Sequence, residues 1–391
     1  MPFRTTCTAD TSCACSARRR QTAEETQSGR WTGCAWTASG TAPGRRATGW
    51  REGTLARSSS TSSSPRASGA RSSGTPRSPA TRSAGTRASA ARPRTRSKKP
   101  QTAVSVVLIS HNEGEELART VHGIMATLPP RSEVIVVDDC STDSSADFID
   151  ETYAAVRLLK PDERLGVARA RNLGAASATG EVLVFSDAHV RVGFGWLEGL
   201  LPVLDRPQVG AVGPAISVVG NASAKGYGYT FDDLSFSCRW LGWQSSEPHP
   251  VPMLCGCFFA MRKEVFESAG GFDAGFRGWG GEDSELSLRL WLLGYECLVV
   301  PSVEVGHLFR QRFHYDVDMA TCLHNNLRLA VVHFGERLLE RTFARHARDS
   351  SFPSALAQVI EGDVYETRRR LRERRQRDDE WFFGRFGIPV N

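Results

Sequence analysis

The chain has 391 residues and a formal net charge of +6, from 49 Lys and Arg against 43 Asp and Glu. This length allows one large α/β domain with an appendage, or two average domains. No run of about 18 apolar residues occurs, so we expect no membrane-spanning helix. The first residues also lack the apolar segment that a signal peptide requires.

The positive charge is concentrated in residues 1–100, which hold 19 of the basic residues and only 4 of the acidic ones. This arm is rich in Ser, Thr, Ala, Arg and Gly, and it cannot bury enough apolar surface to offset its ordering entropy. We therefore expect disorder. Three interpretations stay open: a tether to nucleic acid or an anionic membrane, a solvated tail, or out-of-frame translation before a misassigned start. The few aromatic residues argue against specific nucleic-acid binding.

Order is predicted to begin near Ala103, where continuous apolar runs start to alternate with helical spacing. The runs predict strands at 104–110, 133–138, 156–160 and 181–186, and the spacing predicts helices at 115–128, from about 143, and at 166–178. Such alternation is typical of a parallel sheet with helices on both faces. The sequence therefore predicts an α/β fold.

The pattern changes beyond residue 194. Strands are expected at 209–219, 254–261 and 296–305, and helices at 263–269, 282–294, 322–335 and about 360–378. We divide the ordered part into a domain over 101–340 and a charged helix with an aromatic tail over 341–391. The tail contains Trp381-Phe382-Phe383, which we expect to pack back onto the domain. Peripheral binding to a membrane surface is the alternative.

Six of the ten cysteines lie after residue 100, without the paired CxxC spacing of a zinc site and without a regular disulfide framework. We interpret them as reduced, mostly buried thiols. This interpretation favours a cytoplasmic location.

Polar residues follow three predicted strands: Ser110-His111-Asn112, Asp138-Asp139 and Asp187-Ala188-His189. Ligands of α/β sheets bind beyond the carboxyl ends of the strands, so we expect the site there. Asp187 and His189 are spaced to reach one side of a loop, and this oxygen and nitrogen pair suits Mn²⁺, or Mg²⁺ less well. Such a cation offsets charge on a departing phosphate. A surface turn is the alternative.

Asp138 and Asp139 can accept hydrogen bonds from a base or ribose, and a helix cap is the alternative for this pair. A second acidic group is Glu282-Asp283, which follows Trp279-Gly280-Gly281. The glycines allow a close approach of this loop, and adjacent carboxylates suit general-base work or binding of sugar hydroxyls. The alternative is stabilisation of the helix dipole. His307 alone would more often be a buried imidazole, and Arg310 can pair with phosphate.

With these motifs in this order, residues 103–337 resemble the polypeptide N-acetylgalactosaminyltransferase family and related GT-A enzymes. The matching motifs are His111-Asn112-Glu113, Thr120-Val121-His122, Val137-Asp138-Asp139, Asp187-Ala188-His189, Gly195-Trp196-Leu197-Glu198, Phe272-Asp273-Ala274-Gly275, Trp279-Gly280-Gly281-Glu282-Asp283, Ser287 with Arg289 and Trp291, Val305-Gly306-His307-Leu308-Phe309-Arg310, and Asn325-Asn326-Leu327-Arg328-Leu329-Ala330. The resemblance implies a GT-A domain with a mixed, mostly parallel sheet.

The resemblance also implies roles for single residues. Asp187, His189 and His307 would bind Mn²⁺. The nucleotide-binding or phosphate-binding residues would be His111, Asp138 or Asp139, Arg164 and Arg310. The donor side would be completed by Ala188, Gly256, Trp279 and Glu282.

Three departures from the family pattern stand out. Asp283 replaces the family's Asn, and an acid at this position is the base in several inverting GT-A families. Cys255-Gly256-Cys257 replaces Ala-Gly-Gly beside the donor sugar, so the second cysteine narrows that space. The family's lectin domain and membrane anchor are expected to have no counterpart.

We therefore expect a glycosyltransferase that uses a nucleotide sugar, with UDP as the nucleotide, Mn²⁺ as cofactor and an acceptor that the sequence does not identify. Asp283, beside Glu282, would be the general base of an inverting reaction. The alternatives are a retaining N-acetylgalactosaminyltransferase-like transfer without an enzymic base, and a sugar-nucleotide binding module without catalytic activity.

Overall fold

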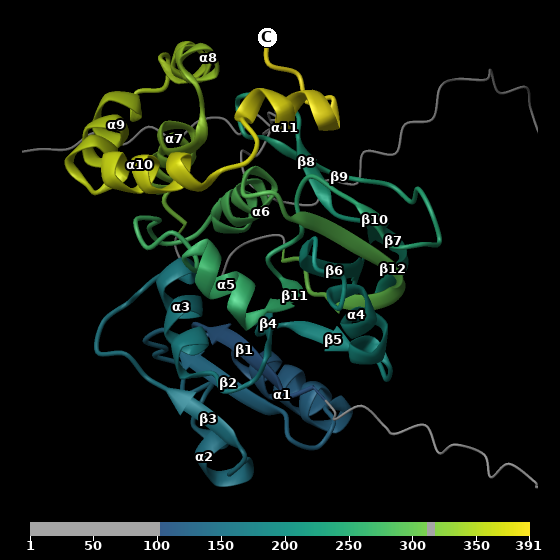
Figure 1. Cartoon of the computed structure of the whole chain (residues 1–391). Coiled ribbons are helices and arrows are strands. Elements are labelled where there is room, and N and C mark those ends of the chain that lie inside the picture. The colour runs from purple at the N-terminus through teal and green to yellow at the C-terminus, as the bar shows by residue number, and fades with distance from the viewer. Residues whose placement is uncertain (1–101, 311–316) are drawn as a thin grey trace, which may run out of the picture. The chain divides into compact units, whose positions relative to one another are not determined.

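A ten-stranded mixed sheet lies at the centre of the computed structural model, which describes residues 102–310 and 317–391 (Figure 1). The strand order is β10-β12-β6-β11-β4-β1-β2-β3, with β5 paired to β12 and β7 to β6. A separate hairpin joins β8 to β9. The predictions for residues 1–100 lie outside the described residues.

The strands are β1 (Val104–Ser110), β2 (Glu133–Asp138), β3 (Val156–Leu159), β4 (Val182–Asp187), β5 (Val190–Val192), β6 (Val209–Val218), β7 (Asn221–Gly226), β8 (Tyr229–Phe231), β9 (Cys238–Trp240), β10 (His249–Pro250), β11 (Phe258–Arg262) and β12 (Glu296–His307). β3, β2, β1 and β4 are parallel neighbours, whereas β11 runs antiparallel to both β4 and β6. The α/β fold with a mixed sheet is confirmed.

The helices are α1 (Glu115–Thr127), α2 (Phe148–Thr152), α3 (Val167–Ser177), α4 (Trp196–Leu204), α5 (Lys263–Ala269), α6 (Glu282–Leu292), α7 (Met319–His333), α8 (Glu336–His346), α9 (Phe352–Glu361), α10 (Val364–Arg374) and α11 (Asp379–Phe386). Side chains alternate across a strand, so each strand feeds two cores. On β1, Val106 and Leu108 belong to the core that contains residues of α1 and α4, whereas Val107 belongs to the core that contains residues of α3 and α6.

The parallel register explains why the site forms at one edge. Ser110 of β1 pairs with Asp138 of β2, and Ile109 pairs with Asp187 of β4. The carboxyl ends of three neighbouring strands therefore meet, and the polar residues that follow them come together as the sequence predicts.

The C-terminal helices pack on α7 and α6, and the aromatic tail is part of the core. In α11, Phe382 and Phe383 are buried, and the ring of Trp381 lies 6.1 Å from that of Trp291. The prediction that this tail packs back onto the domain is confirmed. None of the helices in the described ranges combines the length and the apolar character that a bilayer crossing requires.

Several boundaries differ from the sequence predictions. The short helix expected from about 143 begins only at Phe148, because Asp143 accepts backbone hydrogen bonds from Gly114 and Ser145 that hold the preceding loop. The single helix expected over 360–378 is two helices, α9 and α10, separated at Gly362-Asp363.

Two further differences concern β11 and the cysteines. The strand expected at 254–261 starts at Phe258, because the residues before it form a turn that contacts α6. All six described cysteines are free thiols, as expected, but only three are buried. Cys257, Cys297 and Cys322 are buried, whereas the other three are half-buried.

Candidate active site

Three side chains from separate elements meet where β4 and β12 end and β5 begins. Asp187 ends β4, His189 lies in the turn to β5, and His307 ends β12. Pairing of His307 with Val190 and a hydrogen bond from the amide of Leu308 to the carbonyl of His189 join the two segments. One ligand atom from each of the three side chains lies within 4.8 Å of the others. Their spacing suits one shared metal ion.

The hydrogen bonding of His307 supports a metal ligand role. Both ring nitrogens are buried without a hydrogen-bond partner among the described residues, and the nearest charged group is the Oδ2 atom of Asp187, 3.4 Å from Nε2. Burial lowers the pKa of His307, which favours the neutral imidazole that a metal needs. A buried nitrogen without a partner is costly, and a divalent cation would satisfy it. The residues therefore fit such an ion.

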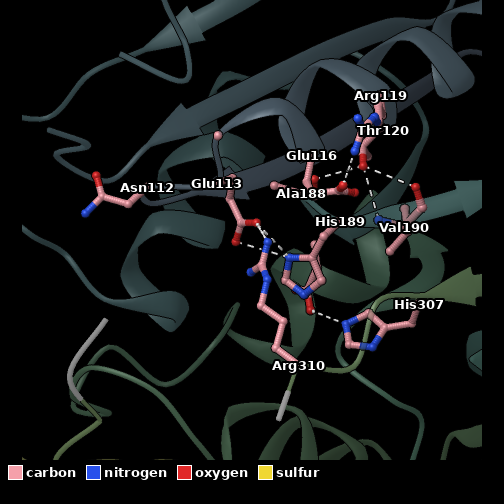
Figure 2. Close-up of polar contacts among 12 residues, drawn as sticks. Asn112, Glu113, Glu116, Arg119, Thr120, Ala188, His189, Val190, His307 and Arg310 are labelled. Carbon is pink, nitrogen blue, oxygen red and sulfur yellow. Dashed lines mark hydrogen bonds and ion pairs between the residues drawn. The ribbon is translucent and has the colours of Figure 1, made fainter. Parts of the chain in front are cut away.

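Glu113 orients His189 (Figure 2). The Nδ1 atom of His189 lies 3.1 Å from each oxygen of Glu113, so it donates its proton there and leaves Nε2 for a metal. Arg310 donates to the same carboxylate at 2.7 Å. Burial disfavours the ionised carboxylate, but these bonds from His189 and Arg310 keep the pKa of Glu113 below its usual value. A carboxylate behind a ligating histidine is a frequent second layer of metal sites.

Arg171 is a buried arginine that the sequence analysis did not identify as a site residue. Its Nη2 lies 3.0 Å from Asp187 and donates to the carbonyl of Gly256 at 2.7 Å, while Nη1 lies 3.1 Å from Glu282. It projects from α3 and connects Asp187, one of the three candidate metal ligands, to Glu282 at the start of α6. The sequence alone does not distinguish Arg171 from neighbouring Arg169, which is exposed. Arg171 would have been identified only if the buried face of α3 had been assigned.

The two acids at the start of α6 have different surroundings. Asp283 accepts hydrogen bonds from the amides of Gly256 and Ser284, both at 2.8 Å, and from the phenol of Tyr229. Glu282 instead pairs with Arg171. Burial, followed by the charge of Asp283, raises the pKa of Glu282 to about 7. Burial raises the pKa of Asp283 as well, although its hydrogen bonds oppose this.

Gly256 lies between these charged groups with no room for a side chain. A Cβ atom there would come within 3.0 Å of the Oδ2 atom of Asp283 and 3.1 Å of the guanidinium of Arg171. The backbone at Gly256 therefore approaches these two side chains closely, a contact that the sequence analysis did not predict. This close approach results from the packing of Gly256 between Arg171 of α3 and Asp283 of α6.

A second polar group forms at the ends of β1 and β2. The Nδ1 atom of His111 donates to the carbonyl of Asp139 at 2.8 Å, and its Nε2 accepts from Arg164, also at 2.8 Å. The Asp139 carboxylate accepts from the amides of Leu165 and Gly166 at 2.6 and 3.0 Å. Asp138 accepts from the amide of Ser141 at 3.1 Å. His111, Asp139 and Arg164 thus lie together, and their role in nucleotide binding stays a prediction.

The remaining predicted site residues lie at the edges of this arrangement. Ala188 is buried, and its carbonyl accepts from the hydroxyl of Thr120 at 2.8 Å, which fixes the turn between Asp187 and His189. Trp279 is half-buried in the loop before α6, and its carbonyl contacts the thiol of Cys322 at 3.5 Å.

Comparison with known proteins agrees with this geometry. Residues 105–270 match the model of glycosyl transferase family 2, and residues 243–314 match that of the N-terminal domain of galactosyltransferase. Polypeptide N-acetylgalactosaminyltransferase 3 of Taeniopygia guttata is 34% identical over 265 residues, which cover 61% of this chain and 43% of the relative. The human enzyme of the same name is 33% identical over 265 residues, covering 61% and 42%. This chain therefore spans less than half the length of these relatives.

Among solved structures, GalNAc-T7 with UDP, GalNAc and Mn²⁺ is similar with a TM-score of 0.63 and 25% identity. The similarity covers 75% of this chain and 59% of that one. The chain therefore has a GT-A-type fold, and part of it is similar to glycosyl transferase family 2 and to the polypeptide N-acetylgalactosaminyltransferases.

Proposed function

We propose that this glycosyltransferase moves a sugar from a UDP-sugar to an acceptor hydroxyl, with Mn²⁺ held by Asp187, His189 and His307. The observation that carries the proposal is this three-ligand cluster, in which both nitrogens of buried His307 have no hydrogen-bond partner in the described structure. The similar GalNAc-T7 was crystallised with UDP, GalNAc and Mn²⁺, which supports the same donor class and ion here.

The protein residues would divide the binding of the donor between them. Bound Mn²⁺ would supply Lewis-acid stabilisation of the charge on the departing diphosphate. The cluster of His111, Asp139 and Arg164 at the ends of β1 and β2 is suited to the nucleotide, because it combines imidazole, carboxylate and guanidinium groups. Arg171 is suited to the sugar side, since it reaches both Asp187 and Glu282.

For the reaction itself, we propose inversion with Asp283 as the general base. An inverting displacement needs a base on the face opposite the leaving phosphate, poised to take the proton of the acceptor. A raised pKa suits a carboxylate to this role. Asp283 remains half-buried, so part of its side chain is accessible.

A retaining transfer is the second candidate. Both oxygens of Asp283 already accept hydrogen bonds from backbone amides, which favours a role in holding the loop at Gly256. In that case Asp283 would bind the protein rather than the acceptor, and no enzymic base would be needed.

A donor-hydrolysis screen with the full chain tests the proposal. Purified protein is incubated with UDP-, GDP- and TDP-sugars, with Mn²⁺, with Mg²⁺ or with excess chelator, and release of nucleotide is measured. We expect turnover of a UDP-sugar that chelator abolishes and Mn²⁺ restores. Full activity in excess chelator would contradict the metal assignment, and preference for another nucleotide would contradict the donor assignment.

A further inference from the structure

Two thiols lie against each other in the turn before β11. The Sγ atoms of Cys255 and Cys257 are 3.2 Å apart. An S–S bond is about 2.05 Å long, so closure requires the two atoms to approach by about 1.2 Å. Cys255 is half-buried and Cys257 is buried, which gives the pair one accessible and one enclosed sulfur.

The backbone of the same turn makes hydrogen bonds to three residues of the candidate site. The carbonyl of Cys257 accepts from the amide of Asp187 at 2.9 Å. One residue earlier, the amide of Gly256 donates to Asp283 at 2.8 Å and its carbonyl accepts from Arg171 at 2.7 Å. Any rotation of these peptide groups therefore alters contacts to the metal cluster, to the acid of α6 and to the buried arginine.

We propose that Cys255 and Cys257 form a dithiol modification site that low-molecular-weight disulfides oxidise reversibly, and that closure of this pair disables the donor site. The second half of this inference rests on the proposed function. A ring closed over Gly256 has to rotate its peptide groups, and the neighbouring charged side chains leave no space to absorb the movement.

The chemistry needs no other reactant. The Cys255 thiolate attacks one sulfur of the small disulfide and expels the first small thiolate. Cys257 then loses its proton and attacks the Sγ atom of Cys255, which expels the second. Two protein thiols are oxidised to one disulfide, the small disulfide is reduced to two thiols, and the two protons pass to the leaving thiolates. Cys257 is buried whereas Cys255 is half-buried, so the small disulfide can reach Cys255 and the first attack falls to this thiol.

Peptide mass mapping tests the thiol chemistry. The full chain is incubated with glutathione disulfide, remaining thiols are blocked, and the peptide that contains both cysteines is analysed. We expect a loss of two hydrogens in that peptide, reversed by dithiothreitol. Both thiols of a folded protein remaining fully blockable after this treatment would overturn the proposal.

Activity and metal binding test the consequence. Oxidised wild-type protein should lose about 100-fold in Mn²⁺-dependent donor hydrolysis, since a displacement of about 1 Å in a catalytic group costs that much. Each variant is compared with its own reduced form. Cys255→Ser should be insensitive to glutathione disulfide, whereas Cys238→Ser, which removes a half-buried thiol outside the turn, should respond as wild type does. An equal loss in Cys255→Ser would overturn the proposal.

A failure of the proposed function can be told apart from a failure of this inference. Absence of hydrolysis in the reduced protein would contradict the proposed function alone. Mn²⁺ affinity, measured by electron paramagnetic resonance, then decides the inference. Weaker binding in the mapped disulfide form supports it, and unchanged binding overturns it.

Discussion

The Nη2 atom of Arg171 lies 3.0 Å from the Oδ1 atom of Asp187, so a buried guanidinium directly contacts a carboxylate of the metal cluster. Burial raises the pKa of Asp187, but the 3.4 Å contact with His307 and the charge of Arg171 outweigh burial and hold this pKa well below its usual value. A ligand that stays ionised is available to a cation over the whole neutral range. Arg171 is therefore a structural partner of the candidate metal site as well as a link to α6.

Replacement of Arg171 by Met should destabilise the fold and abolish donor turnover. Breaking a buried ion pair by removing one partner costs about 3–5 kcal/mol, because Asp187 and Glu282 are left unpaired. Urea unfolding and donor hydrolysis measure the two effects. Arg169→Met is the matched control, since this neighbouring arginine is exposed and, within the described ranges, pairs with exposed Glu163 at 3.4 Å. Equal stabilities of the two variants would contradict the role of Arg171.

Arg171 also shows why part of the site was not predictable from the sequence. Asp187 and His189 were predicted as ligands because they follow the strand predicted at 181–186, whereas His307 was assigned from the family resemblance of its motif. Arg171 and Glu113 act through contacts with residues up to 197 positions away. No local pattern reports such contacts, because they depend on how α3 and the loop after β1 pack in the finished fold.

The bounds of the helices and strands were likewise predictable only in part. The predicted bounds of β1, β2 and α5 agree with the structure, because a continuous apolar run or a helical repeat determines each of them. The start of β11 was misplaced. Residues 254–257 are apolar enough for a strand, but hydrogen bonds of Gly256 to charged side chains hold them in a turn. Tertiary contacts outweighed the local preference there.

Glu113→Gln should weaken the metal site without removing a ligand. The amide cannot hold the proton of His189 and the guanidinium of Arg310 as a carboxylate does. Loss of such a partner typically reduces metal affinity about 10–100-fold. Mn²⁺ titration followed by electron paramagnetic resonance measures the change. Glu115→Gln, which alters an exposed glutamate of α1, should bind as wild type does. Wild-type affinity in Glu113→Gln would show that His189 is oriented by other contacts.

A separate prediction concerns stability at low pH. Glu285 is buried and pairs with Arg289 and His333. These partners overcome the effect of burial and lower its pKa from 4.5 to about 2. The ionised carboxylate thus stabilises the folded state above pH 4.5, and this contribution is lost as the pH falls from there towards 2. The shift corresponds to on the order of 3 kcal/mol.

Urea unfolding at several pH values compares wild type with Glu285→Gln. The variant should be less stable near neutral pH, because Arg289 loses its charged partner and His333 loses a carboxylate hydrogen-bond partner. It should also lose less stability than wild type between pH 4.5 and 3. Glu264→Gln, at an exposed carboxylate of α5, serves as the control. Parallel pH profiles of wild type and Glu285→Gln would show that this carboxylate does not contribute to acid unfolding.

The last prediction decides the stereochemistry. Asp283→Asn keeps the size and shape of the side chain. It also introduces the residue found at this position in the family that the sequence resembles. An amide has one acceptor oxygen, so it keeps only part of the bonding to the amides of Gly256 and Ser284. If Asp283 is the base, the rate should fall by about 10²–10⁴, since that is the usual contribution of a positioned base. Glu282→Gln separates this effect from the ion pair with Arg171. Nuclear magnetic resonance of the product gives the anomeric configuration, and a UDP-α-sugar should give a β-linked product. An α-linked product, formed by Asp283→Asn at close to the wild-type rate, would establish retention and reduce Asp283 to a residue that holds the turn at Gly256.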